Sequence, residues 1–264
     1  MPLCQPSLYI PHGGGPCFFM DDPHGMWTDM AAFLRGLPDL LPERPAAILV
    51  VSGHWETSDF AFTGAGNPPL VYDYYNFPPH TYQLAYPAPG EPALAARAAG
   101  LLQDAGFRAA VDPERGLDHG VFVPLKVAFP DADVPVVEMS LDRSLDPRQH
   151  LAAGAALAPL RQEGVLILGA GMSFHNLRAY GHPQATAPSR LFDRWLTDAI
   201  GMAAADRGAA LTEWEAAPAA RLAHPREEHL LPLMVAAGAS SEVGRRIFAG
   251  EVMHTAVSGY AFPC

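Results

Sequence analysis

Apolar residues along the chain follow two alternating patterns, short continuous aliphatic runs and longer segments with apolar positions at helical spacing. The aliphatic runs predict strands at residues 7–10, 46–52, 60–62, 134–141 and 164–171. The helical spacing predicts helices at residues 91–106, 146–164, 189–208 and 226–239. Pro159 is expected to kink or shorten the second helix. This alternation predicts an α/β fold, with a mainly parallel or mixed central sheet flanked by helices.

The bulk composition fits one globular domain over residues 1–264. The chain has 264 residues, 49% of them hydrophobic and 17% charged, which is enough to bury a sizeable core. No low-complexity linker or charge block divides it. Its formal net charge of −11 argues against nucleic acid or an anionic membrane as the main partner.

The cysteines and the N-terminal segment bear on the cellular compartment. Cys4, Cys17 and Cys264 are an odd number without a CxxC pair, so we expect neither a disulfide framework nor a cysteine-based zinc knuckle. The N-terminus shows no basic segment followed by an apolar one, and no apolar stretch reaches the roughly 20 residues of a membrane span. These features predict a soluble cytoplasmic protein.

A proline-rich segment at residues 67–90, "NPPLVYDYYNFPPHTYQLAYPAPG", has no strand or helix pattern. A loop of this length inside a compact domain usually has a function or forms an oligomer contact. Tyr72, Tyr74 and Tyr75 leave two hypotheses open, a lid over a site and a subunit contact in a homo-oligomer.

Three histidines lie just beyond predicted strands. His12 follows "SLYI", His54 follows "AAILVVS", and His175 follows "GVLILGAG". Ligands of an open α/β sheet bind outside the carboxyl ends of its strands, so these side chains can converge on one crevice. His119, in a loop, and His229, near a predicted helix start, are further candidates. Ordinary loop, helix or surface roles are expected for His24, His80, His150, His182 and His254.

Imidazoles from separate elements suit a borderline divalent metal such as Fe(II), Zn or Mn. Glu227 and Glu228 lie beside His229, so a carboxylate is available as a ligand or as its support. The histidine spacing contains no HExxH pair and gives no support to a zincin protease.

The segment "PHGGGP" at residues 11–16 also has the glycines of an esterase oxyanion loop. An esterase of that kind needs a G-x-S-x-G nucleophile elbow, and the nearest match, "GMSFH", has His175 in place of the last glycine. The loop of that fold follows several strands, whereas only one strand fits before His12. The metal-site interpretation is therefore favoured.

Five motifs together resemble those of the class III extradiol ring-cleaving dioxygenases: "PHGGGP", "VVSGHW", "GLDHGVFVPL", "GAGMSFHNL" and "PREEHLLPLM". The resemblance runs from residue 11 to about 235 and is strongest to the DOPA 4,5-dioxygenase-like group, related to the catalytic subunit of protocatechuate 4,5-dioxygenase. Several members of that group carry Ser-Pro after the first His-Gly. This chain has Gly-Gly-Pro there, which indicates a neighbouring branch and argues against DOPA as the substrate.

The resemblance implies a non-haem Fe(II) site with His12, His54 and His229 as ligands, which Zn²⁺ can also occupy. Glu228 is a lesser candidate for the third ligand, because the protocatechuate branch uses a glutamate in that role. His175 matches the family's catalytic acid/base and is a candidate fourth metal ligand. His119 matches a second-sphere histidine that contacts substrate or dioxygen.

The implied reaction opens a small aromatic diol of the catechol type with O₂, beside its two hydroxyls, to a muconic semialdehyde-type product. Two alternatives stay open: a zinc-dependent hydrolase with His175 as acid/base, and a member of the same fold that binds metal or phenol without turnover. Metal content separates them, because Zn²⁺ has no redox chemistry. Either pocket wall or plain core is expected for Trp55, Phe122 and Phe174.

Overall fold

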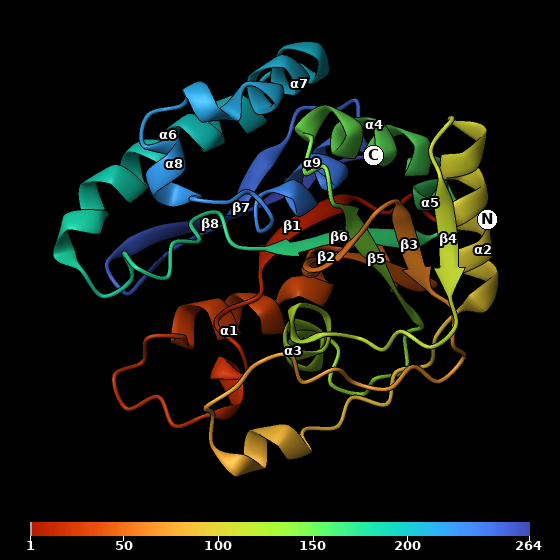
Figure 1. Cartoon of the computed structure of the whole chain (residues 1–264), viewed down its shortest axis with the longest axis horizontal. Coiled ribbons are helices and arrows are strands. Elements are labelled where there is room, and N and C mark those ends of the chain that lie inside the picture. Colours follow the sequence, from red (N-terminus) through yellow and green to blue (C-terminus); the bar gives the residue numbers. More distant parts are fainter. Residues whose placement is uncertain (1) are drawn as a thin grey trace.

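One mixed sheet of eight strands, in the order β4-β3-β5-β2-β6-β1-β8-β7, crosses the computed structural model, which describes residues 2–264 (Figure 1). The strands are β1 (Ser7–Pro11), β2 (Ala47–Thr57), β3 (Phe60–Thr63), β4 (Ala109–Asp112), β5 (Val136–Asp142), β6 (Val165–Gly171), β7 (Arg245–Val252) and β8 (Thr255–Phe262). Strands β5, β2, β6 and β1 are parallel, and β8 and β7 add an antiparallel edge. The predicted α/β class with a parallel or mixed sheet is confirmed.

Side chains of the central strands alternate between two buried cores. In β1, Tyr9 belongs to the core on one face, while Leu8 and Ile10 belong to the core on the other. The same alternation holds in β2 and β6. It explains why these strands read as continuous aliphatic runs, since both faces of the sheet are covered.

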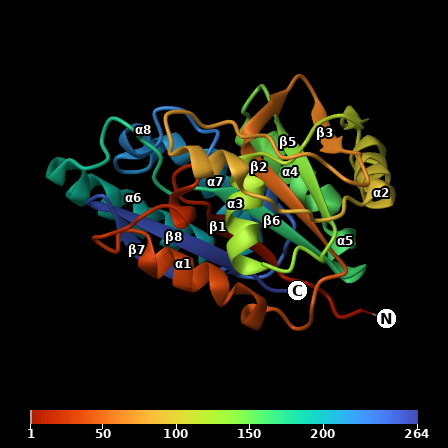
Figure 2. The ribbon, with the colours of Figure 1, turned by 90° about the horizontal axis from the view of Figure 1, so that it is seen from below.

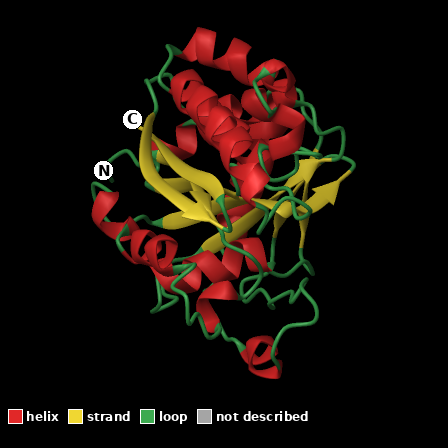
Figure 3. Ribbon diagram, turned by 90° about the vertical axis from the view of Figure 1, so that its left-hand side faces the viewer, coloured by secondary structure: helices red, strands yellow, loops and turns green. Residues whose placement is uncertain are grey.

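Helices cover both faces of the sheet (Figures 1 and 3). They are α1 (Thr28–Arg35), α2 (Pro92–Asp104), α3 (His119–Ala128), α4 (Pro147–Leu157), α5 (Pro159–Gln162), α6 (Thr186–Ile200), α7 (Ala204–Thr212), α8 (Ala220–Ala223) and α9 (Leu231–Gly238). Residues of α1 and α3 pack into the core that contains Leu8, and those of α2 and α4–α9 pack into the core that contains Tyr9. No helix in residues 2–264 combines the length and apolarity needed to cross a membrane.

The predicted helices are confirmed with shifted ends. Segment 146–164 contains α4 and α5, which are separated before Pro159 as expected. Segment 189–208 contains two helices instead of one, because α6 ends at Ile200 and α7 begins at Ala204. The prediction misses α1, α3, β4 and the β7–β8 hairpin. Strand β4 is a partly exposed edge strand of four residues, which is too short to give a clear apolar period.

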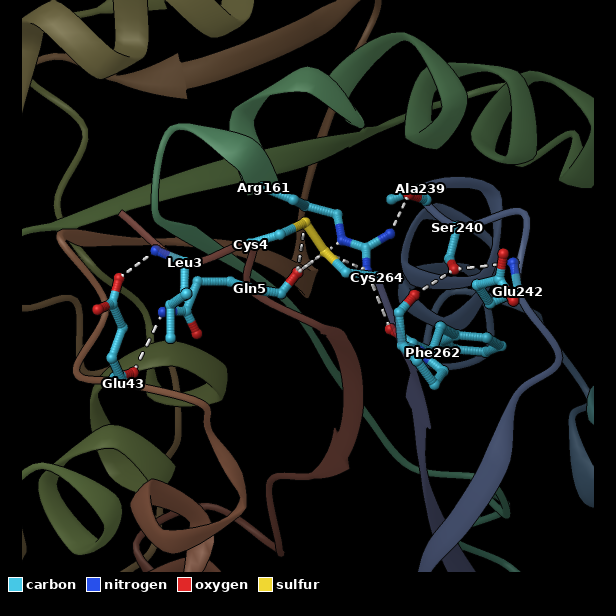
Figure 4. Close-up of a disulfide and its surroundings, with 11 residues drawn as sticks. Leu3, Cys4, Gln5, Glu43, Arg161, Ala239, Ser240, Glu242, Phe262 and Cys264 are labelled. Carbon is cyan, nitrogen blue, oxygen red and sulfur yellow. Dashed lines mark hydrogen bonds between the residues drawn. A yellow bond between two sulfur atoms is a disulfide. The ribbon is translucent and has the colours of Figure 1, made fainter. Parts of the chain in front are cut away.

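The two ends of the chain meet at a disulfide between Cys4 and Cys264 (Figure 4). Figures 2 and 3 show both termini on the same side of the molecule. The sequence analysis expects no disulfide framework and does not predict this single bond, because spacing along the sequence says nothing about segments that the fold brings together. Cysteine usage consequently gives no support to a reducing compartment. Cys17 is free and buried.

Candidate metal centre

The carboxyl ends of β1, β6 and β2 lie side by side, because β6 pairs in parallel with both neighbours. His12 follows β1 directly, and its backbone N–H donates to the Gly171 carbonyl at 3.1 Å. His175 lies four residues beyond β6, and its backbone N–H donates to the Ala223 carbonyl at 2.9 Å. Both histidines are therefore anchored at the edge of the sheet where the sequence analysis expects them.

His54 lies inside β2 instead of beyond its end. The register of β2 against β5 shifts between Val51 and Glu56, and an irregularity of this kind re-aims the side chains within it. A Cβ on Gly53 would lie 2.8 Å from the backbone oxygen of Glu228. Glycine at this position therefore lets β2 approach the turn that precedes α9.

His229 lies in that turn, between α8 and α9. Its carbonyl accepts hydrogen bonds from the Tyr9 hydroxyl at 2.8 Å and from the Met172 N–H at 3.2 Å. A Cβ on Gly171 would collide with the same carbonyl oxygen. The glycine at the end of β6 thus seats the His229 turn directly on the sheet.

The Nε2 atoms of three histidines converge at this edge. The Nε2 of His54 is 3.4 Å from that of His12 and 3.2 Å from that of His229. Two nitrogens bound to one metal at about 2.1 Å and at roughly 90–110° would be about 3.0–3.4 Å apart. The observed spacing fits that range, so the three side chains form a group that could hold a metal ion.

Burial keeps the three rings neutral. It lowers the pKa of His12 and His229 well below the ordinary value and lowers that of His54 to about 4. The neighbouring imidazoles lower these pKa values further, because positive charges would repel one another at this distance. A neutral imidazole offers the lone pair that metal binding requires.

Asp73, in the proline-rich loop, is a site residue that the sequence analysis misses. Its Oδ1 accepts from the Nδ1 and the backbone N–H of His119 at 2.7 and 3.0 Å, and its Oδ2 lies 3.6 Å from the Nδ1 of His54. Burial opposes ionisation of this carboxyl, but the hydrogen bonds from His119, together with the electrostatic attraction of His119 and His54, lower the pKa of Asp73 to about 2. An ionised Asp73 favours protons on both Nδ1 atoms and leaves the Nε2 lone pairs free.

Two tyrosines next to Asp73 make hydrogen bonds within the same loop. The hydroxyl of Tyr72 donates to the Leu84 carbonyl at 2.5 Å, and that of Tyr74 donates to the Thr81 carbonyl at 2.6 Å. The loop therefore folds on itself around the two tyrosines that flank Asp73. Tyr75 is 79% exposed and takes no part in this packing.

Glu228 plays the corresponding part for the other two histidines. Its Oε1 lies 3.0 Å from the Nδ1 of His229 and 3.3 Å from the Nδ1 of His175, whose rings stack with centroids 3.4 Å apart. Burial opposes ionisation, but the hydrogen bonds from His175 and His229 hold the pKa of Glu228 well below its usual range. Glu228 thus faces the Nδ1 atoms of both rings, and it also forms a second group with His175 and His229 that could hold a metal ion.

The remaining candidates lie elsewhere. His150 is buried in α4, and its Nε2 accepts from the Asp142 N–H at 3.2 Å. Phe122 and Phe174 belong to the two cores, and the ring of Trp55 packs 5.0 Å from the Arg115 guanidinium. The core interpretation is therefore confirmed for Phe122 and Phe174, whereas Trp55 is buried but belongs to neither core.

Five histidines lie at the carboxyl ends of the parallel strands of a mixed sheet, and two carboxylates face their outer nitrogens. This arrangement defines the chain as an α/β protein with a candidate metal site. Residues 6–263 match the LigB family, described as the catalytic LigB subunit of aromatic ring-opening dioxygenase. The chain belongs to this family, and with it to the class III extradiol dioxygenases.

Similar proteins agree with this assignment. The chain is 41% identical to dioxygenase tasH of Hapsidospora irregularis, over 90% of this chain and 78% of that protein. It is 39% identical to the 4,5-DOPA dioxygenase extradiol of Beta vulgaris, over 96% of this chain and 92% of that protein. Among solved structures, the uncharacterized protein JW3007 from Escherichia coli K12 matches with a TM-score of 0.77 and 29% identity, over 98% of this chain and 100% of that one.

Proposed function

We propose that the protein opens a catechol-type aromatic diol with O₂ by the extradiol route, to a muconic semialdehyde-type product, and that residues 1–264 form one catalytic domain. The observation that carries this proposal is the convergence of three neutral imidazole Nε2 atoms beside two further histidines. We assign His12, His54 and His229 as metal ligands. Non-haem Fe(II) is the active metal, and Zn²⁺ is an inactive occupant of the same site.

His12, His54 and His229 would hold a ferrous ion, which would supply the redox chemistry that lets a catecholate react with O₂. His175 supplies the proton transfer. With Nδ1–H directed at Glu228, its Nε2 is free to accept the second hydroxyl proton of the substrate and to return a proton when the O–O bond breaks. His119, fixed by Asp73 through its Nδ1, presents its Nε2 to contact substrate or dioxygen. Cytoplasmic location and a homo-oligomeric state remain predictions from the sequence.

The proposal is tested by anaerobic reconstitution with Fe(II), followed by a catechol panel with oxygen uptake and visible absorbance recorded together. We expect uptake coupled to a new yellow product with iron and none with zinc. His12→Ala and His54→Ala are expected to abolish stoichiometric metal binding. His175→Ala is expected to keep most of the metal and lose turnover, because its task is proton transfer.

Each part of the proposal has its own contrary result. Full metal occupancy in His12→Ala or His54→Ala removes that residue from the ligand set. Unchanged turnover in His175→Ala removes the acid/base assignment. If the iron-loaded protein takes up no oxygen with any catechol, the dioxygenase function is contradicted. Hydrolytic activity of the zinc-loaded protein would then favour the zinc-dependent hydrolase.

A further inference from the structure

A cavity of about 470 Å³ lies beside the histidine cluster and reaches it at His175. Glycines 13–15, directly after His12, form part of its wall. The other walls consist mainly of aromatic rings and methionine side chains, among them Trp27, Phe77, Tyr180, Met20, Met172 and Met253. Methionine is flexible and polarizable, so these walls can adapt to apolar groups of different shapes.

Three polar side chains in this wall are already engaged within the protein. The hydroxyl of Tyr180 donates to the Phe174 carbonyl at 2.5 Å, and the Cys17 sulfur accepts from the Gly14 N–H at 3.3 Å. Both carboxylate oxygens of Asp22 accept backbone hydrogen bonds, from Met26 at 2.9 Å and from Trp27 at 2.8 Å. The cavity therefore offers ring faces and thioethers in preference to free hydrogen-bond donors.

The charged groups that line the cavity are predominantly acidic. Asp21 is exposed at the mouth, and Asp22 lies beside it. His24 and His175 also line the cavity, and within residues 2–264 the lining contains no lysine or arginine. A carboxylate bound in this cavity would therefore find two negative charges and no permanent positive one, which disfavours it.

We propose that this cavity holds the ring substituent of the catechol and selects apolar substituents that carry no negative charge. The inference rests on the proposed dioxygenase function, because a diol bound at the histidine cluster with its ring beside His175 directs its substituent into the adjoining cavity. Each methylene buried there is expected to tighten binding about fourfold.

The test compares propylcatechol, dihydrocaffeate and dopamine, whose side chains are similar in length but neutral, anionic and cationic. With the iron-loaded enzyme at low salt, we expect kcat/KM for propylcatechol to exceed that for dihydrocaffeate at least about tenfold, mainly through KM. Dopamine is expected to be accepted at least as well as dihydrocaffeate. Equal or better use of dihydrocaffeate would overturn the proposal.

Charge reversal at the mouth provides the matched variant. Asp21→Lys is expected to lower the ratio of kcat/KM for propylcatechol to kcat/KM for dihydrocaffeate about threefold or more, and this effect should shrink with added salt. Asp104→Lys makes the same charge change at an exposed position at the end of α2 that does not line the cavity. It should leave kcat/KM unchanged for both propylcatechol and dihydrocaffeate. An identical response of both variants would show a general charge effect and reject the assignment to Asp21.

Binding of the three catechols to zinc-loaded protein, measured by calorimetry without O₂, distinguishes a failure of the proposed dioxygenase function from a failure of the cavity assignment. Absence of turnover by the iron form with a preserved binding order contradicts the proposed function and leaves the cavity assignment supported. Turnover of all three catechols with no charge preference contradicts the cavity assignment alone.

Discussion

At the residue scale, each of two carboxylates serves two histidines. Asp73 faces the Nδ1 atoms of His54 and His119, and Glu228 faces those of His229 and His175. Each carboxylate thus couples a proposed metal ligand to a histidine with a proposed role in the reaction. The proton positions of four rings depend on two side chains, so a change in either carboxylate should affect metal affinity and turnover together.

We predict that Asp73→Asn lowers metal affinity about 10- to 100-fold. The amide keeps the shape of the carboxylate, but its NH₂ group is a donor that conflicts with one of the two Nδ1–H groups and favours the wrong tautomer. Competition with a chelator measures the affinity, and nitrogen chemical shifts of the imidazoles report the tautomers in the zinc form. Asp104→Asn, at an exposed position without a histidine contact, should change neither. Unchanged affinity and imidazole shifts in Asp73→Asn would exclude the positioning role.

At the element scale, close backbone approach places His229 on the sheet. Gly53 in β2 and Gly171 at the end of β6 both face the turn before α9, and a side chain at either position would meet its backbone. These two glycines therefore serve close packing. The proposed metal site, whose candidate ligands follow β1, lie in β2 and lie in this turn, is therefore sensitive to the spacing between these elements.

We predict that Gly53→Ala weakens metal binding about tenfold and lowers the free energy of unfolding by roughly 1–3 kcal/mol, because the new Cβ would lie 2.8 Å from the Glu228 backbone oxygen. Gly100→Ala is the control, because a Cβ on this α2 residue meets nothing within 4 Å. That change should raise stability by about 0.5–1 kcal/mol and leave metal binding intact. Urea unfolding and zinc titration of both variants measure the two effects. Normal zinc affinity in Gly53→Ala would show that the turn tolerates displacement.

The pattern of apolar residues predicts the central strands and, through them, the position of three of the five histidines. The aliphatic runs locate β1, β2, β5 and β6, and parallel pairing then brings His12, His54 and His175 to one edge. Asp73 could not be predicted in this way. It lies in an irregular loop whose path depends on contacts between distant residues, such as the hydrogen bond from the Val71 N–H to the Leu117 carbonyl at 2.8 Å. Hydrophobic periodicity carries no information about such a path.

At the scale of the whole molecule, a disulfide joins the first and last segments of the chain. The Cys4–Cys264 disulfide spans 260 residues of sequence, and the buried Arg161 guanidinium reinforces it. Arg161 donates to the carbonyls of Gln5, Ala239 and Phe262 at 2.8, 2.6 and 3.2 Å (Figure 4). Burial lowers the pKa of Arg161 to about 10, so the guanidinium stays charged near neutral pH. The disulfide and the hydrogen bond from Arg161 to Gln5 therefore hold the segment that leads into β1, the strand that His12 follows.

We predict that Cys4→Ser and Cys264→Ser each lower the free energy of unfolding by about 2–4 kcal/mol, because the open chain gains conformational entropy when it unfolds. The double variant should be no less stable than either single variant, since all three lack the same bond. Unfolding in urea with and without reductant measures this, and reductant should destabilise only the native sequence. Under denaturing conditions the oxidised protein should expose one reactive thiol, that of Cys17, and the reduced protein three. Additive losses in the double variant, or three thiols without reductant, would mean that stability near the termini comes from Arg161 and packing alone.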